Sequence, residues 1–410
     1  MKTQIPLFVL AVGSLAAEPP LPYAKDVEFL RKHTSVVELK DGDAAVALAP
    51  AYQGRVMTST TDGDHGYSFG WLNYKVIERG VLSEQEAAGK LESHIYVFGG
   101  EERFWLGPEG GQFGIFFPAG SKFDFANWKT PPPLDTQPFE VLASAVTRAE
   151  FAKDFTVTNH SGTRFEVAVK RSVRLLPKAE VATLLGVPLP DTVKLVAYQT
   201  SNQLTNRGSK EWTPDAGLLS VWLLGMYKPS PETVIALPFR QGEAAQFGPV
   251  VNDAYFGKVP GERLKVREGV IFFKGDGQQR GKIGIPPRRS LGVAGSYSGD
   301  SRALTLVLYE PPQGPARYVN SAWEQQKDPF SGDVINSYND GSPAPGEAPL
   351  GPFYELETSS PAAALKPGAS IMHRQTTIHL TGEPATLDAV ANKQLHTSLK
   401  VLKSVFAEGK

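Results

Sequence analysis

Two glutamates spaced two residues apart, Glu355 and Glu357, are the residues of this sequence best suited to acid–base chemistry. They stand in the strand-like run from Phe353 to Thr358. Because side chains alternate between the two faces of a strand, both carboxylates would lie on one face. Each raises the pKa of the other, which gives a carboxyl group that can act as an acid. An exposed edge strand with two solvated glutamates fits the same pattern.

A third carboxylate, Glu109, lies on a glycine-rich turn at residues 107–114 that also carries Gln112. The glycine spacing fits neither the P-loop nor the Rossmann fingerprint, so it predicts no phosphate or dinucleotide site. A glutamate on a stiff turn is suited to the wall of a pocket. We therefore include Glu109 and Gln112 among the candidate site residues.

Arg171 falls on the apolar face of the alternating run 164–176. A charge on such a face must be paired or must line a cleft, because desolvating it alone is costly. We expect a cleft-lining arginine that stabilises charge, with a buried structural ion pair as the alternative.

Amide and aromatic side chains complete the candidate site. Planar polar groups hydrogen-bond hydroxyls, and flat rings stack on sugar faces, so this combination is typical of a carbohydrate site. The candidate binding residues are Asn127, Asn202, Asn206, Asn336, Tyr338 and Asn339, with Trp105 or Trp128 as the stacking ring.

Several chemistries find no support in the sequence. There is no cysteine, the seven histidines show no short metal-binding pattern, and there is no Gly-x-Ser-x-Gly motif. We expect no metal and no cofactor. The formal net charge of −1 and the lack of a basic run give no electrostatic footprint for nucleic acid or a membrane surface.

Forty glycines and 33 prolines in 410 residues predict many turns and short strands. Apolar spacing predicts a leading helix at residues 23–33 and a closing helix at 386–406. Alternation predicts strands that include residues 44–48, 55–60, 93–98 and 164–176. Residues 158–161, which include His160, are interpreted as a hairpin turn.

The N-terminus predicts export. Residues 5–17 are apolar, follow Met1 and Lys2, and end in small residues, as in a secretory signal peptide. The run is too short to span a bilayer. We expect a signal peptide at residues 1–17, a single domain at 18–410, and a periplasmic or secreted protein; the alternative is a buried N-terminal strand.

The C-terminal motif resembles that of the aldose 1-epimerase (galactose mutarotase) superfamily. The resemblance rests on the run Leu356 to Ser359, then Leu365 to Gly368 before a closing strand. It implies an all-β fold, the galactose mutarotase-like β-supersandwich, with a few short peripheral helices and a C-terminal helix. It also implies that Glu357 is the general base. Four further sequence segments are similar to an exported bacterial subfamily without an established activity: residues 55–60, 108–113, 336–341 and 354–361.

The sequence departs from the superfamily at both histidine positions that the resemblance implies. The first histidine precedes two glycines in the superfamily, where this chain has Pro108 and Glu109. The second, a general acid on a central strand, corresponds to the region of Arg171, and arginine cannot donate a proton. The acid would then be Glu109, Glu355 or a water molecule.

These features predict an exported carbohydrate-active protein that binds a sugar or oligosaccharide in a concave cleft. We expect acid–base chemistry at or near the anomeric centre, as in an epimerase. Two alternatives stay open: a non-catalytic glycan-binding protein, and a lyase or hydrolase that cleaves a glycoside with a carboxylate pair.

Overall fold

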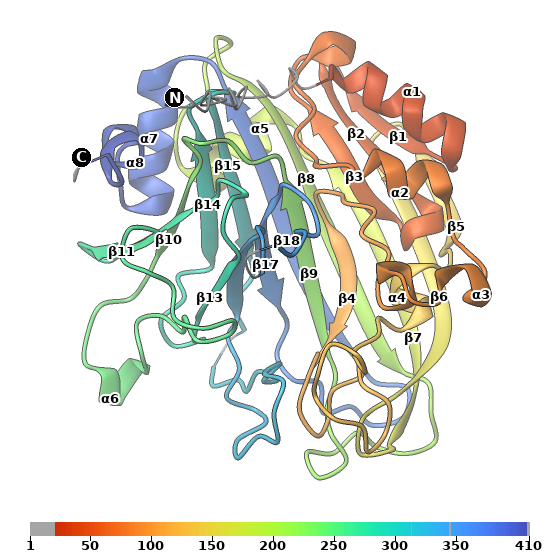
Figure 1. Cartoon of the computed structure of the whole chain (residues 1–410). Coiled ribbons are helices and arrows are strands. Elements are labelled where there is room, and N and C mark those ends of the chain that lie inside the picture. Colours follow the sequence, from red (N-terminus) through yellow and green to blue (C-terminus); the bar gives the residue numbers. More distant parts are fainter. Residues whose placement is uncertain (1–20, 313, 344–345, 408–410) are drawn as a thin grey trace, which may run out of the picture.

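The computed structural model describes residues 21–312, 314–343 and 346–407 (Figure 1). The expected signal peptide at residues 1–17 lies outside these residues, so export stays a prediction, as does a single domain from residue 18 to 410. Within the described ranges, every helix is too short or too polar to cross a membrane.

The strands of the described residues form three antiparallel sheets, and the largest contains ten strands. From one edge of this sheet to the other, neighbouring strands follow the order β11 (Leu264–Arg267), β12 (Val270–Lys274), β10 (Val234–Pro238), β14 (Val293–Ser298), β15 (Ala303–Tyr309), β18 (Ser370–Thr381), β8 (Lys194–Asn206), β7 (Arg164–Leu175), β6 (Arg148–Thr158) and β5 (Glu140–Ala145).

A five-stranded sheet packs on the ten-stranded one, and a three-stranded sheet lies beside them. The five-stranded sheet has the order β13 (Gly281–Ile285), β16 (Ile335–Asn339), β17 (Tyr354–Ser359), β9 (Ser220–Tyr227) and β4 (Arg103–Gly107). The three-stranded sheet is β1 (Val37–Asp41), β2 (Ala44–Ala49) and β3 (Arg55–Thr60).

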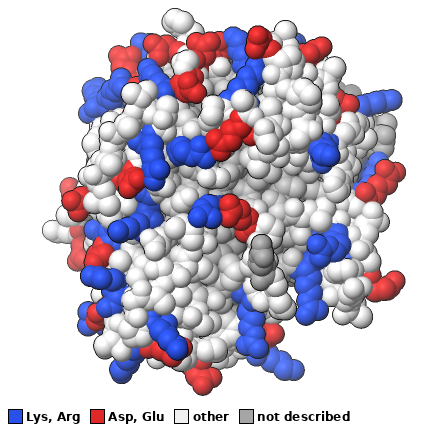
Figure 2. Space-filling view, turned by 180° about the vertical axis from the view of Figure 1, so that it is seen from behind, with Lys and Arg blue, Asp and Glu red and all other residues white. Residues whose placement is uncertain are grey.

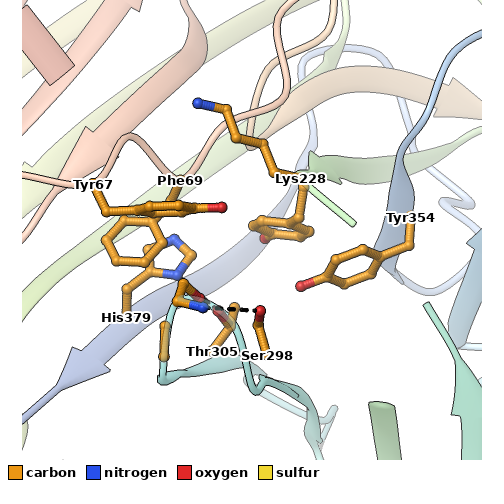
Figure 3. Close-up of a pocket in the computed structure, with 10 residues that line it drawn as sticks. Tyr67, Phe69, Lys228, Ser298, Thr305, Tyr354 and His379 are labelled. Atoms are coloured by element: carbon orange, nitrogen blue, oxygen red, sulfur yellow. Dashed lines mark hydrogen bonds between the residues drawn. The ribbon is translucent and has the colours of Figure 1, made fainter. Parts of the chain in front are cut away.

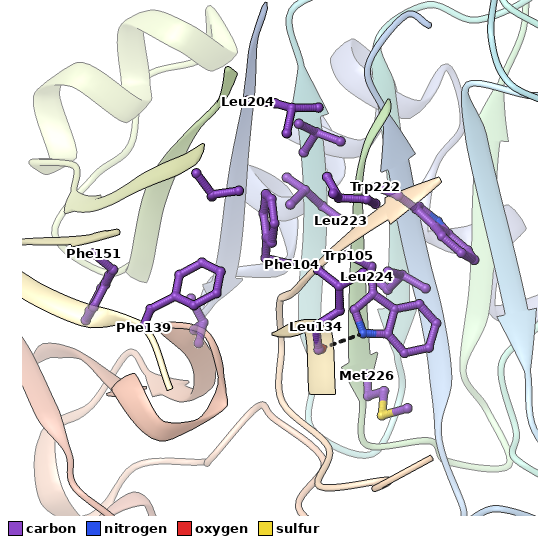
Figure 4. Close-up of a cluster of buried hydrophobic side chains, with 14 of the residues drawn as sticks. Phe104, Trp105, Leu134, Phe139, Phe151, Leu204, Trp222, Leu223, Leu224 and Met226 are labelled. Carbon is purple, nitrogen blue, oxygen red and sulfur yellow. Dashed lines mark hydrogen bonds between the residues drawn. The ribbon is translucent and has the colours of Figure 1, made fainter. Parts of the chain in front are cut away.

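Apolar side chains fill the space between the two larger sheets. Phe104 and Leu223 belong to one buried cluster with Phe151 and Val169 of the ten-stranded sheet. Figure 4 shows Phe104 and Leu223 on one side of β4 and β9, toward Phe139 and Phe151, and Trp105 and Trp222 on the other side. The strand alternation therefore gives the five-stranded sheet an inner face in the core and an outer face that carries different residues.

Short helices cover the edges of this sandwich. They are α1 (Tyr23–His33), α2 (Tyr74–Arg79), α3 (Glu84–Ala87), α4 (Pro132–Asp135), α5 (Lys178–Leu185), α6 (Ala244–Phe247), α7 (Pro384–Leu395) and α8 (Leu399–Ser404), with 3₁₀ turns at Pro50–Tyr52, Gly63–His65 and Leu91–Ser93. Helix α1 packs on the three-stranded sheet, and α5, α7 and α8 pack on the ten-stranded sheet.

The prediction of an all-β sandwich with peripheral helices is confirmed. The helix at residues 23–33 and the strand at 55–60 have the predicted bounds, and His160 lies in the turn between β6 and β7. The prediction of a single closing helix at residues 386–406 is wrong in detail, because His396 adopts a left-handed conformation that separates α7 from α8. The strand at 93–98 is also wrong: the Tyr96 amide donates to the Asp135 carboxylate instead of to a sheet partner.

Candidate functional site

The outer face of the five-stranded sheet carries charged and aromatic residues in register. Residues directly opposite each other in an antiparallel pair share a face. Strand β17 is the middle strand, so the neighbours of Glu355 and Glu357 on four other strands can be read from the pairing. This face presents Lys282, Asn336, Tyr338, Glu355, Glu357, Trp222 and Arg103.

Glu357 is fully buried at the centre of this face. Its Oε2 accepts a hydrogen bond from the Trp222 indole N–H at 2.9 Å and forms an ion pair with Lys282 Nζ at 3.0 Å. Its Oε1 is also buried and has no hydrogen-bond partner in the described part of the chain. Among the described residues, the carboxylate is thus held at one oxygen only.

Glu355 lies two residues away on the same face, as predicted, but it is buried rather than at an exposed edge. It forms a buried ion pair with Arg103 of β4. Burial raises the pKa of Glu355 to about 8; Arg103 opposes the rise and the Glu357 charge adds to it. Two carboxylates with different cationic partners therefore stand side by side.

Glu109 reaches the same cluster from the glycine-rich turn after β4. The turn lies close to the segment around Ala322, because a Cβ on Gly110 would come within 2.6 Å of the Ala322 carbonyl. Glu109 Oε1 accepts a hydrogen bond from the Trp128 indole at 2.9 Å. Burial raises the pKa of Glu109; the charge of Lys282 opposes the rise and that of Glu357 adds to it.

Lys282 links the three glutamates. Burial acts to lower its pKa, but the carboxylates of Glu357, Glu109 and Glu355 outweigh burial and raise the pKa. Its ammonium group lies 4.9 Å from the centroid of the Trp222 ring. The structure thus brings the three predicted glutamates together around one lysine.

A tyrosine–aspartate pair borders this cluster. Tyr255 donates a hydrogen bond to Asp333 Oδ2 at 2.6 Å and accepts one from the Asn336 amide at 3.0 Å. The Tyr255 ring centroid is 5.6 Å from Lys282 Nζ. Asn336, a predicted binding residue, therefore orients Tyr255 beside the acid–base cluster.

Arg171 does not line a cleft, so that expectation is wrong. It lies on β7 inside the sandwich, where it pairs with Glu102 at 2.8 Å and bonds to Asn202 at 2.6 Å. Both side chains of the ion pair are fully buried. Alternation correctly placed Arg171 on the inward face of β7, but other parts of the sandwich cover that face. Asn202, also predicted to bind a ligand, is occupied by this structural network.

The other predicted binding residues have structural partners. Gln112 bonds to the backbone of Gln326, and Asn206 to the carbonyls of Lys210 and Leu365. The rest are held by neighbouring groups: half-buried Asn127 by Asp124, Trp105 by the Leu134 carbonyl, Tyr338 by Asp340, and Asn339 by Asp276, the Gln279 carbonyl and the Asp340 carbonyl.

His373 belongs to the same interior network as Arg171 and gives a testable pH dependence. Its Nε2 lies 2.8 Å from Thr358 Oγ1, and burial lowers its pKa to about 3. In the unfolded chain it titrates near pH 6.5, so its contribution to stability is complete above that pH and is lost as pH falls toward 3.

We expect the free energy of unfolding of wild type to fall faster with acidity than that of His373→Gln. Below about pH 6.5 the difference should change by up to about 1.4 kcal/mol per pH unit. Urea unfolding of both proteins between about pH 5 and pH 7 measures this. Parallel curves would show that His373 has the same pKa in the folded and the unfolded state.

A small pocket lies between the sheets, where the Phe69 ring stacks on His379 with centroids 4.1 Å apart (Figure 3). His379 Nε2 lies 3.0 Å from the buried Glu101 carboxylate. The cavity is about 10 Å³, room for a single water molecule. It is therefore too small for a sugar ring.

A larger groove of about 460 Å³ lies on the outer face of the ten-stranded sheet, and none of the described residues that line it is aromatic. Lys170 and Gln203 are among its lining residues. Seen from behind, the molecule has lysine and arginine interspersed with aspartate and glutamate, without one continuous patch of either sign (Figure 2). Among the described residues, no group of three or more histidines and carboxylates could hold a metal ion.

The sequence did not predict that Lys282, Trp222, Arg103 and the Tyr255–Asp333 pair belong to the site. Lys282 is a lone charge in a short apolar strand, which is the one signal that could have found it. Strand β9 is buried on both faces, so its sequence has no alternation to indicate where Trp222 points.

A protein-family model described as Family of unknown function (DUF6786) matches residues 21–406. No curated protein matches the chain. The solved structures that it resembles include a putative aldose 1-epimerase from Escherichia coli, with 12% identity, a TM-score of 0.49, and coverage of 85% of this chain and 99% of that one.

Two further solved structures come from lactobacilli. A galactose mutarotase-like protein from Lactobacillus casei has 11% identity and a TM-score of 0.44, over 84% of this chain and 100% of its own. A galactose mutarotase related enzyme from Lactobacillus acidophilus has 8% identity and a TM-score of 0.41, over 85% and 97%. The sequence resembles the same superfamily, but likenesses this distant concern the fold alone and transfer no residue role.

Proposed function

Since the chain belongs to the Family of unknown function (DUF6786), whose description names no activity, we propose its function from the site: it binds a sugar on the outer face of the five-stranded sheet and interconverts its anomers by acid–base chemistry. The observation that carries this proposal is the Glu357 carboxylate. It is buried and fixed at Oε2 by Trp222 and Lys282, while Oε1 has no hydrogen-bond partner among the described residues.

Glu357 is the general base in this proposal. Its Oε1 takes the proton of the anomeric hydroxyl while an acid protonates the ring oxygen, so the bond between the anomeric carbon and the ring oxygen breaks. The open-chain aldehyde rotates about the adjacent carbon–carbon bond. Ring closure on the opposite face returns both protons, so the enzyme ends in its starting state.

Glu109 is the acid that the geometry favours. It is held by the neutral indole of Trp128 and forms no ion pair within the described residues, whereas Glu355 is paired with Arg103. The raised pKa of Glu109 keeps more of it protonated near neutral pH. Glu355 would then modulate the charge of the cluster.

Glu109→Gln tests the assignment of the acid. We expect kcat to fall by about 10²- to 10⁴-fold and the loss of activity at high pH to disappear, because that loss reports deprotonation of the acid. The pH–rate profiles of wild type, Glu109→Gln and Glu355→Gln measure this. A high-pH limb that survives in Glu109→Gln but vanishes in Glu355→Gln would make Glu355 the acid.

The function as a whole is tested by following anomer exchange by NMR for a panel of reducing sugars. We expect faster exchange for at least one sugar, with no change in its composition. Ligand shifts without exchange would instead indicate a glycan-binding protein, and new products would indicate a glycoside-cleaving enzyme. No shift and no turnover for any sugar would contradict the proposal.

A further inference from the structure

We propose that the site takes a glycan of at least two sugar rings, with the reducing-end ring at Glu357 and the second ring stacked on Phe256. This inference rests on the proposed function and specifies its substrate class. The observations that carry it are the position, the exposure and the one free face of the Phe256 ring.

Phe256 borders the acid–base cluster. It follows Tyr255, whose ring faces Lys282, and its own ring packs edge-on against Tyr338 with centroids 5.9 Å apart. Tyr338 lies directly opposite Glu355 in the sheet. Because paired strands are about 4.8 Å apart, Phe256 lies next to the cluster rather than at a remote edge.

Phe256 is an exposed aromatic ring, with 43% of its surface accessible. The Arg280 guanidinium carbon lies 4.0 Å from its centroid and stacks on one side of the ring. This cation–π contact holds the ring in place. A fixed ring offers a stacking surface without the entropic cost of ordering it on binding.

The other exposed phenylalanine near the site, Phe125, cannot serve in this way. Its ring is stacked on His94, with centroids 4.6 Å apart, and on Trp128, at 6.1 Å. For Phe256, by contrast, the structure records a stacking partner on one side only among the described residues. Exposure alone does not distinguish the two rings, but the number of stacking partners does.

The length of the ligand follows from this arrangement. A monosaccharide with its anomeric hydroxyl at Glu357 would leave the Phe256 ring in water. A second ring linked to the first would cover the free face and exclude that water, as in other aromatic contacts. The site is therefore built for a reducing oligosaccharide rather than for a free monosaccharide.

The test compares reducing monosaccharides with the di- and trisaccharides built from the same units, using anomer-exchange NMR for rate and KM. We expect KM to fall by about 3- to 10-fold from the monosaccharide to the disaccharide in wild type. Phe256→Ala should remove that gain and leave the monosaccharide KM unchanged, and Phe256→Tyr should retain it. Phe125→Ala is the matched control and should retain the gain.

Three outcomes would overturn the inference. The first is equal KM values for mono- and disaccharides in wild type, and the second is a gain that survives Phe256→Ala. The third is a gain that Phe125→Ala removes, which would mean that the second sugar ring lies at Phe125 instead of Phe256. If monosaccharides are still turned over, the proposed function stands without this inference; if no sugar is bound or turned over, both fail.

Discussion

Glu357→Gln should lose sugar turnover by about 10²- to 10⁴-fold while keeping its fold and most of its sugar affinity. Glutamine keeps the shape of the side chain and can still accept the Trp222 indole hydrogen bond. It cannot take a proton from the anomeric hydroxyl. Anomer exchange measures the rate, a binding titration measures the affinity, and urea unfolding measures the stability.

The control for this variant is Glu180→Gln, which changes an exposed glutamate that pairs with Arg174 far from the site. It should leave turnover unchanged. The role of Glu357 would be structural if Glu357→Gln lost several kcal/mol of stability and kept its turnover. That result would mean that the pair with Lys282 serves only to neutralise two buried charges.

Arg171→Leu should destabilise the protein by about 3 to 5 kcal/mol. The substitution leaves the Glu102 carboxylate buried without its cation, and removes bonds to Asn202 and to the Gly54 carbonyl. The remaining Gln375 amide donates to Glu102 but carries no charge. Denaturant unfolding of wild type and variant measures the loss.

Arg174→Leu is the matched control, three residues along the same strand. Its ion pair with Glu180 is exposed, so its loss should cost no more than about 1 kcal/mol. The double variant Arg171→Leu/Glu102→Leu should recover much of the stability lost by Arg171→Leu, because it leaves no unpaired buried charge. Equal losses for Arg171→Leu and Arg174→Leu would contradict the assignment of a buried pair.

Local patterns predicted several elements of this fold well. The strand at 55–60 and the alternating run that became β7 were predicted from apolar spacing within a few residues. The spacing of Glu355 and Glu357 predicted a shared face, which β17 provides. The prediction of one continuous closing helix failed, because apolar spacing alone does not show that His396 adopts a left-handed conformation.

The composition of the site depends on strand register, which a single sequence does not contain. The alternation of apolar residues correctly predicted that Arg171 points inward. It does not show whether the inward face lines a cleft or lies between two sheets. Likewise, Glu357 could be chosen from its motif, whereas its partners Lys282 and Trp222 are 75 and 135 residues away in the chain. Only the pairing of β13, β16, β17 and β9 brings them together.

The most direct test of the proposed sugar site is a crystal structure with a reducing disaccharide that the protein binds or turns over. We expect the anomeric hydroxyl within about 3.2 Å of Glu357 Oε1, the ring oxygen toward Glu109, and the second ring on Phe256. A sugar bound instead in the groove around Lys170 and Gln203, on the outer face of the ten-stranded sheet, would contradict it.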